Sequence, residues 1–251
     1  MTDIPNISAQ GGSAPFAVGS VLSHAFEVFG RATGKFLVLA FIPLLPVLVV
    51  PFLGFTDKSN PAAIGIGAAV IGIVTMIAGT LANAMTLFGA FREMRSEDFT
   101  IGESFRVGLK RFFPIIGLAI VVGIAVGLAT MLLIVPGLIL LCMWYVAVPA
   151  CIIEGLGVGA SMSRSRELTR GYRWQVFGLV ALILIATMLV SFIVGYMTVK
   201  LAGAGVLSTL ANFALQVIST AFGAVLSAIV YHDLRVAKEG VDVSKMAKVF
   251  D

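Results

Sequence analysis

The sequence predicts an all-α polytopic membrane protein with about six transmembrane helices, arranged as three hairpins that are each preceded by an interfacial amphipathic helix. Apolar residues make up 59% of the chain and charged residues only 12%, whereas soluble globular domains contain roughly 45–50% and roughly 25%. The charges also fall between long charge-free stretches, which is typical of helices that span a bilayer and need roughly 20 apolar residues. Three short segments with similar beginnings precede pairs of these stretches.

The charge-free stretches place the predicted spans in chain order. They cover residues 36–56, 59–91, 112–153, 174–199 and 201–231. The middle stretch is about twice as long as one span, and Val135-Pro136-Gly137 near its centre is a turn signal. It is therefore predicted to hold spans three and four, which gives six spans in all.

The distribution of Lys and Arg predicts that both termini are cytoplasmic, because cytoplasmic loops of membrane proteins are enriched in basic residues. With this orientation fifteen of the 17 basic residues lie on the cytoplasmic side, and only Lys58 and Lys200 lie on the other. We expect a multi-pass protein of the bacterial inner membrane. Its membrane domain covers residues 18–232, between a flexible N-terminal tail (1–17) and a cytoplasmic C-terminal tail (233–251).

An internal repeat is predicted from three similar segment beginnings, near residues 18, 101 and 158. They read Val18-Gly19-Ser20, Ile101-Gly102-Glu103-Ser104 and Val158-Gly159-Ala160-Ser161. Each is expected to open an interfacial helix whose apolar face lies in the headgroup layer, followed by a transmembrane hairpin. The third helix is expected to run through the arginines up to Trp174 and into span five.

The most distinctive candidate site is a lipid- or anion-binding cluster formed by Arg164, Arg166, Arg170 and Arg173. On one continuous helix Arg166, Arg170 and Arg173 share a face, and Glu167 pairs with Arg164 or Arg170 at three-residue spacing. The guanidinium group matches phosphate bidentately, and each basic residue near an anionic leaflet contributes roughly 1 kcal/mol. The alternative is ordinary flanking of span five by basic residues, without a specific ligand.

Proline residues in the first span favour transport as an alternative to lipid binding. Pro43, Pro46 and Pro51 each remove a backbone donor, so span one is predicted to be broken or bent. Discontinuous spans line the substrate sites of many secondary transporters.

Span six carries a polar face, because Asn212, Gln216 and Thr220 follow one another at four-residue spacing, and Asn83 in span two is a candidate to extend it. Such a face either forms interhelical hydrogen bonds or lines a polar conduit. No Asp, Glu, Lys, Arg or His lies deep in a predicted span, which argues against proton- or ion-coupled transport.

The sequence contains no pattern typical of catalysis, metal binding or cofactor binding. Cys142 and Cys151 lie in one apolar segment and are predicted to be inert packing residues. His24 and His232 lack further ligands at metal-binding spacing. We expect no enzyme activity, metal or cofactor. We also expect no nucleic-acid partner, since the net charge of +4 is spread over membrane-flanking loops.

Several of these residues together resemble a bacterial family of six-span membrane proteins, related to the membrane domain that precedes some glycerophosphoryl diester phosphodiesterases. The resemblance covers roughly residues 18 to 242. It is carried by Pro136-Gly137, Trp144, Pro149, Glu154-Gly155, Ser163-Arg164-Ser165-Arg166-Glu167-Leu168-Thr169-Arg170-Gly171, Tyr231-His232-Asp233-Leu234-Arg235 and Lys238-Glu239-Gly240. It implies fold and location. The catalytic barrel domain of those phosphodiesterases is expected to be absent, because the chain ends about nineteen residues after its last predicted span.

The sequence therefore predicts a non-enzymatic integral inner-membrane protein with a lipid-binding or membrane-organising role at its cytoplasmic interface. Its expected partners are anionic membrane lipids, together with a second copy of the chain or another membrane protein. The alternative is a transporter or lipid-translocating protein that uses the kinked span one and the polar face of span six.

Overall fold

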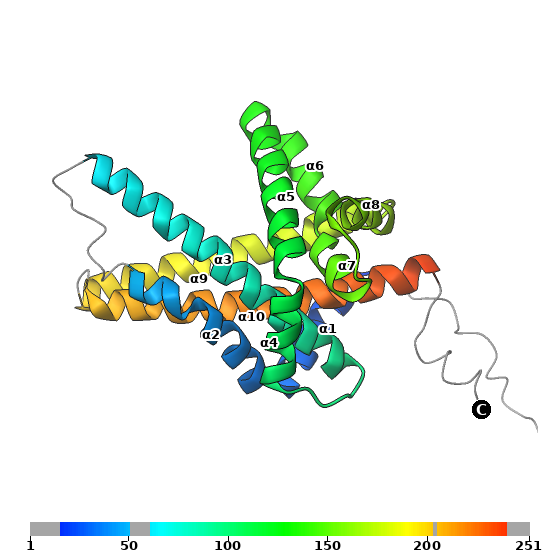
Figure 1. The fold of residues 1–251 in the computed structure, drawn as a ribbon, viewed down its shortest axis with the longest axis horizontal. Coiled ribbons are helices and arrows are strands. Elements are labelled where there is room, and N and C mark those ends of the chain that lie inside the picture. The colour runs from blue at the N-terminus through cyan, green and yellow to red at the C-terminus, as the bar shows by residue number, and fades with distance from the viewer. Residues whose placement is uncertain (1–15, 51–60, 203–204, 240–251) are drawn as a thin grey trace, which may run out of the picture.

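A computed structural model describes residues 16–50, 61–202 and 205–239 of the chain, and within these ranges the fold is helical without strands (Figure 1). The helices are α1 (Val18–Arg31), α2 (Thr33–Val49), α3 (Pro61–Met94), α4 (Ile101–Lys110), α5 (Phe112–Leu132), α6 (Ile134–Trp144), α7 (Ala147–Ile153), α8 (Val158–Thr169), α9 (Arg173–Ala202) and α10 (Val206–Glu239). The predicted tails up to residue 15 and from residue 240, together with Pro51 and Lys58, lie outside the described residues.

The predicted fold class is confirmed. Within the described ranges, five helical segments are long and apolar enough to cross a membrane: Gly65–Met94, Phe112–Leu132, Ile134–Ile153, Arg173–Lys200 and Val206–Glu239. A sixth is the pair α1 and α2, which passes the same criterion together but is bent by 85° at a short break. This bend separates a short amphipathic helix from the apolar helix that follows it.

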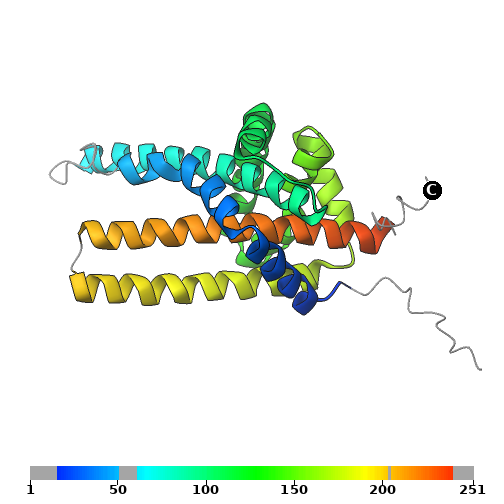
Figure 2. The same cartoon turned by 90° about the horizontal axis from the view of Figure 1, so that it is seen from below.

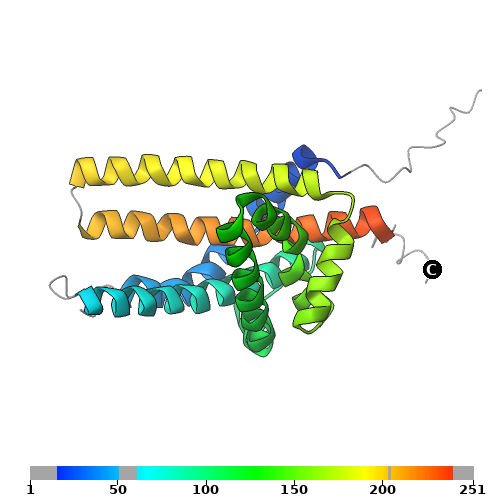
Figure 3. The same ribbon diagram turned by 90° about the horizontal axis from the view of Figure 1, so that it is seen from above.

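Helix α10 is the centre of the molecule. It packs against α9 on one side and against α2 and α3 on the other, and these long helices run lengthwise beside it (Figures 2 and 3). The segment from Ala224 to Tyr231 is buried without interruption. Alanines at 221, 224 and 228 let neighbouring backbones approach closely, as small residues do in membrane bundles.

The hairpin of α5 and α6 is placed differently from the other long helices. It runs across the direction of α9 and α10 and projects away from them (Figure 1). Its tip carries large apolar side chains that are almost fully exposed, such as Met131 at 88% and Leu132 at 81%.

Short helices begin at Val18, Ile101 and Val158, the three positions where interfacial helices are predicted. In α1 the residues Val21, Ala25 and Val28 recur at helical spacing and are buried. The start of α4 is fixed by a capping box, which consists of two hydrogen bonds. The side chain of Thr100 accepts one from the backbone N–H of Glu103, and the side chain of Glu103 accepts the other from the backbone N–H of Thr100. Whether the three units are copies of one repeat stays a prediction.

Span one is predicted to be broken or bent at its prolines, and the structure shows no break at Pro43 or Pro46, because α2 continues through both. The interruption lies earlier, at Ala32 between α1 and α2.

The predicted turn at Val135-Pro136-Gly137 is also displaced, to the single extended residue Leu133. Pro136 falls in the first turn of α6, where the missing N–H costs no helical hydrogen bond. Gly137 is needed for close packing of the hairpin, since a Cβ there would lie 2.9 Å from the Cα of Thr130 on α5.

Span four contains a break that the sequence interpretation did not predict. Helix α6 ends at Trp144 and α7 begins at Ala147. Pro149 explains the break, because its ring conflicts with the carbonyl four residues earlier, at Tyr145. The break leaves carbonyl groups at the end of α6 that need other partners.

Candidate functional site

The Arg-rich segment does not form one helix. Helix α8 ends at Thr169, and the chain turns through Gly171, whose φ is +94°, before α9 begins at Arg173. Glycine adopts this backbone conformation without the steric cost that other residues meet. The predicted common helix face of Arg166, Arg170 and Arg173 is therefore wrong, because each of the three lies on a different element.

The buried face of α8 consists mainly of hydroxyl groups. Ser165 Oγ and Thr169 Oγ1 both donate to the carbonyl of Met143, at 2.8 Å and 3.2 Å. This carbonyl lies in the last turn of α6, where the break in span four leaves it without a helical donor. α8 is thus held against the bundle by these hydrogen bonds together with the buried side chain of Leu168, and its predicted place in the headgroup layer stays a prediction.

Arg164 is enclosed by carboxylates and does not face a ligand. Its Nε donates to both oxygens of Glu154, at 2.8 Å and 3.1 Å, and its Nη2 pairs with Glu239 at the end of α10. Glu167 lies within 3.7 Å, one of the two pairings expected from the sequence. The hydroxyl of Tyr231 also donates to Glu154. The Arg164 cluster, as we call Glu154, Arg164, Tyr231 and Glu239, joins α7, α8 and α10.

The environment keeps Arg164 charged. Burial, the largest single effect, lowers the pKa of Arg164, but hydrogen bonds and charge interactions with Glu154 and Glu239 outweigh it, and the pKa lies above its ordinary value. The side chain of Arg164 is 18% exposed, and its guanidinium already has its partners. Arg164 thus links α8 to the end of α7 and to α10.

Arg166 and Arg170 are exposed, and neither has a carboxylate partner among the described residues. They add positive charge to this end of the molecule, but neither lines the groove described next.

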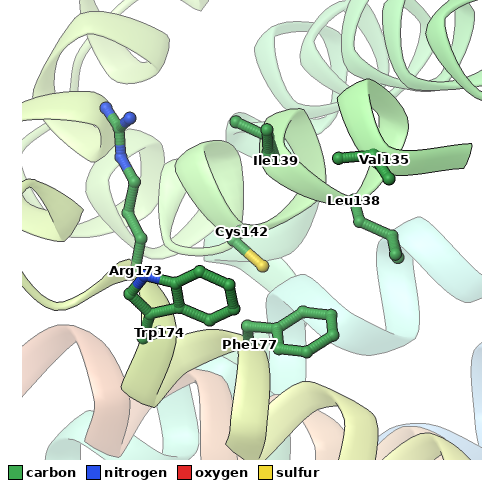
Figure 4. Close-up of a pocket in the computed structure, with 7 residues that line it drawn as sticks. All are labelled: Val135, Leu138, Ile139, Cys142, Arg173, Trp174 and Phe177. Carbon is green, nitrogen blue, oxygen red and sulfur yellow. The ribbon is translucent and has the colours of Figure 1, made fainter. Parts of the chain in front are cut away.

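Arg173 borders an apolar groove between α6 and the start of α9. The groove has a volume of about 390 Å³ and is lined by Val135, Leu138, Ile139, Cys142, Arg173, Trp174 and Phe177. In Figure 4 the guanidinium of Arg173 lies at one end, the rings of Trp174 and Phe177 lie along the middle beside Cys142, and Val135 and Leu138 lie at the other end. A volume of this size falls within the roughly 300–1,000 Å³ typical of small-ligand pockets.

The Nε atom of Arg173 is buried and has no hydrogen-bond partner in the described part of the chain. Buried polar atoms are nearly always satisfied in proteins, so this unpaired donor is unusual among the described residues. The arrangement therefore suits a molecule with an acceptor group at the Arg173 end and an apolar part along the groove.

The residues predicted to form a polar conduit do not lie together in the structure. Asn212 is exposed and donates to the carbonyl of Ser208 on its own helix, at 2.8 Å, while Gln216 and Thr220 are half-buried. Asn83 lines a separate, open hollow of about 420 Å³ with Thr80, Tyr145 and Ser227, among other residues, and none of the other three conduit candidates lines it.

Both cysteines are buried and unpaired, in agreement with a packing role, and Cys142 contributes to the groove. Within the described ranges no group of three or more His, Cys, Asp and Glu side chains is placed to hold a metal ion.

Comparison of the chain with protein-family models, with curated proteins and with solved structures found no match. The resemblance to the membrane domain of glycerophosphoryl diester phosphodiesterases remains a prediction.

The sequence interpretation missed the Arg164 cluster. Glu154, Arg164 and Glu239 are far apart in the chain, and only the packing of α7, α8 and α10 brings them together. One indication is present in the sequence: Glu154 ends a charge-free stretch, and a carboxylate at such a position needs a positive partner. Which of the nearby arginines pairs with it depends on the turn at Gly171, which removes Arg170 and Arg173 from α8.

Proposed function

We propose that this protein is a non-enzymatic integral membrane protein that holds an anionic lipid in the groove between α6 and α9, with the phosphate at Arg173. The main observation in support is that Arg173 borders an otherwise apolar groove. Its Nε is buried and has no hydrogen-bond partner among the described residues. Trp174 is 83% exposed beside it, and tryptophan favours the headgroup level of a bilayer. Arg173 and its phosphate partner would then lie at the same depth.

The headgroup contact decides whether such a lipid is selected. Lipid tails are as apolar as the groove, so moving an acyl chain from the bilayer into it gains little beyond van der Waals packing. A hydrogen bond between a guanidinium and a phosphate is charge-assisted and contributes about 1.5–3 kcal/mol. Selectivity should therefore follow the charge of the headgroup rather than the length of the chain.

The proposal is tested by replacing Arg173 with Gln and counting retained lipids by native mass spectrometry, after reconstitution with phosphatidylglycerol and phosphatidylcholine. Since each 1.4 kcal/mol is tenfold in affinity, we expect R173Q to retain phosphatidylglycerol about tenfold less well. Phosphatidylcholine carries the same phosphate, but its choline cation offsets the charge, so its retention should fall less than that of phosphatidylglycerol.

Arg170→Gln is the matched control, because it removes the same charge three residues away from an exposed position outside the groove. It should change retention by about twofold or less, as expected of general attraction to an anionic surface. Equal losses in R170Q and R173Q would refute a groove-specific lipid and favour simple flanking charge.

A second candidate function is the passage of a small polar solute by way of the hollow that Asn83 lines. The hollow is favoured by its polar side chains, Asn83, Thr80 and Ser227, between α3 and α10. The uninterrupted course of α2 through its prolines and the exposure of Asn212 speak against it. Solute flux into proteoliposomes, compared between the native chain and Asn83→Ala, separates this candidate from lipid binding.

A further inference from the structure

A second hollow, on elements different from those of the groove, is lined by positive charge. It has a volume of about 320 Å³ and lies where the ends of α3, α4 and α7 meet the start of α5. We call it the basic hollow. Its cations are Arg92, Arg95, Lys110 and Arg111, and its apolar lining includes Phe88 and Ile153.

Carboxylates neutralise only part of this charge. Arg92 pairs with Glu97, and its second nitrogen lies 4.0 Å from Glu103. Its third nitrogen, Nε, is buried without a partner in the described part of the chain. Arg92 also lies over the ring of Phe88, 5.7 Å from the centroid, so its guanidinium is held beside the apolar lining.

Arg95, Lys110 and Arg111 form no ion pair with any carboxylate of the described residues. Like charges gathered in one hollow repel one another, and an anion placed among them relieves the repulsion. Within the described residues, the positive charge of the lining exceeds the negative charge placed against it.

Arg111 is held in place by the backbone. Its Nη1 donates to the carbonyl of Gly155 at 3.2 Å. Gly155 has a φ of +70°, and a Cβ there would lie 2.6 Å from Nη2 of Arg111. A glycine is therefore needed for the guanidinium to lie against this loop. A cation fixed in this way loses little conformational freedom when it binds a ligand.

Helix dipoles explain only some of this arrangement. Arg95 and Lys110 lie near the C-terminal ends of α3 and α4, where the helix dipole favours a positive charge. That effect requires neither a hollow nor an apolar lining. It also does not explain the attachment of Arg111 to Gly155 or the unpartnered Nε of Arg92.

We propose that the basic hollow binds a phosphate group carried on an apolar body. The cations suit the phosphate, because guanidinium groups bind it bidentately and a lysine adds a compact charge. Phe88, Ile153 and the other apolar lining suit the remainder of the molecule. Two sources share this chemistry: the headgroup of a phospholipid and a free organic phosphate. The site lies apart from the groove at Arg173 and does not depend on it.

The test uses the full chain with Arg95→Gln and Lys110→Gln combined. One arm titrates the protein in non-ionic detergent, by calorimetry, with phenyl phosphate, which has an apolar ring, and with inorganic phosphate, which has none. The other arm counts phosphatidic acid molecules retained from nanodiscs by native mass spectrometry. Binding in the first arm identifies a free phosphate as a ligand, and binding confined to the second identifies the lipid headgroup. In either arm we expect the double variant to bind at least about tenfold more weakly than the native chain.

Arg106→Gln combined with Arg170→Gln is the matched control. It removes two exposed cations from α4 and from the turn after α8 without touching the hollow. Arg95 and Lys110 are themselves exposed, so both double variants should keep the native unfolding temperature. Absence of binding in both arms, or a loss in the control equal to that in the R95Q/K110Q variant, would overturn the proposal. R173Q should leave binding to the basic hollow unchanged. This variant therefore distinguishes a failure of the basic-hollow proposal from a failure of the proposed lipid site in the groove.

Discussion

Gly155 is a position where a single added atom would displace a charged side chain. Its backbone lies in the left-handed region, and the guanidinium of Arg111 occupies the space where a side chain would begin. The neighbouring residue Glu154 holds Arg164. The loop between α7 and α8 thus joins the basic hollow to the Arg164 cluster through two consecutive residues.

Gly155→Ala should therefore destabilise the protein. The left-handed backbone costs a non-glycine residue roughly 1–2 kcal/mol, and Arg111 must also move away. We expect a loss of about 1–3 kcal/mol, measured as a lower midpoint of thermal unfolding in detergent by circular dichroism. Gly159→Ala is the control, because Gly159 lies in α8 with open space around it, and alanine there should be neutral or stabilising. Similar midpoints for the two variants would contradict this account.

At the scale of elements, the sequence predicts where helices begin better than where they are interrupted. The starts at Val18, Ile101 and Val158 follow from local patterns, and the capping box at Thr100 is one such pattern. The interruptions depend on tertiary partners. A helix ends before Pro149 at an acceptable cost because the hydroxyls of α8, far along the chain, satisfy the carbonyl of Met143.

Removal of these two hydroxyls should loosen α8. In the variant Ser165→Ala with Thr169→Ala, the carbonyl of Met143 loses both of its side-chain donors, and a buried acceptor left unsatisfied costs about 1–3 kcal/mol. We expect destabilisation of that size by chemical denaturation and faster hydrogen exchange across α8. Ser163→Ala, an exposed position on the same helix, is the control and should change stability by about 0.5 kcal/mol or less. Unchanged exchange in the double variant would show that other contacts hold α8.

At the scale of the whole molecule, composition and charge distribution predict the fold class, since each apolar stretch must either span a membrane or be buried. They cannot predict which residues form a site. The four arginines of one short segment have different surroundings: Arg164 is enclosed by carboxylates, Arg173 borders a groove, and Arg166 and Arg170 are exposed. Those differences arise from packing between helices that are distant in the chain.

The hairpin of α5 and α6 raises a separate question, because it runs across the long helices instead of along them (Figure 1). Its exposed apolar tip is too hydrophobic to be stable in water, so it must lie in the bilayer or cross it. The predicted orientation, with both termini cytoplasmic, requires that it cross, and Leu133 at its turn would then lie on the outer side with Gly205 between α9 and α10. Arg170 would lie on the cytoplasmic side.

Single cysteines at Leu133, Gly205 and Arg170, introduced after replacing Cys142 and Cys151 by alanine, test this orientation. All three positions are exposed. In spheroplasts, a membrane-impermeant maleimide should label residues 133 and 205, and it should label residue 170 only after lysis. The pair 205 and 170 reports the orientation of the long helices independently of the hairpin. If residue 205 is labelled in spheroplasts but residue 133 only after lysis, the α5–α6 hairpin lies along the cytoplasmic leaflet, and the number of complete crossings falls from six to four.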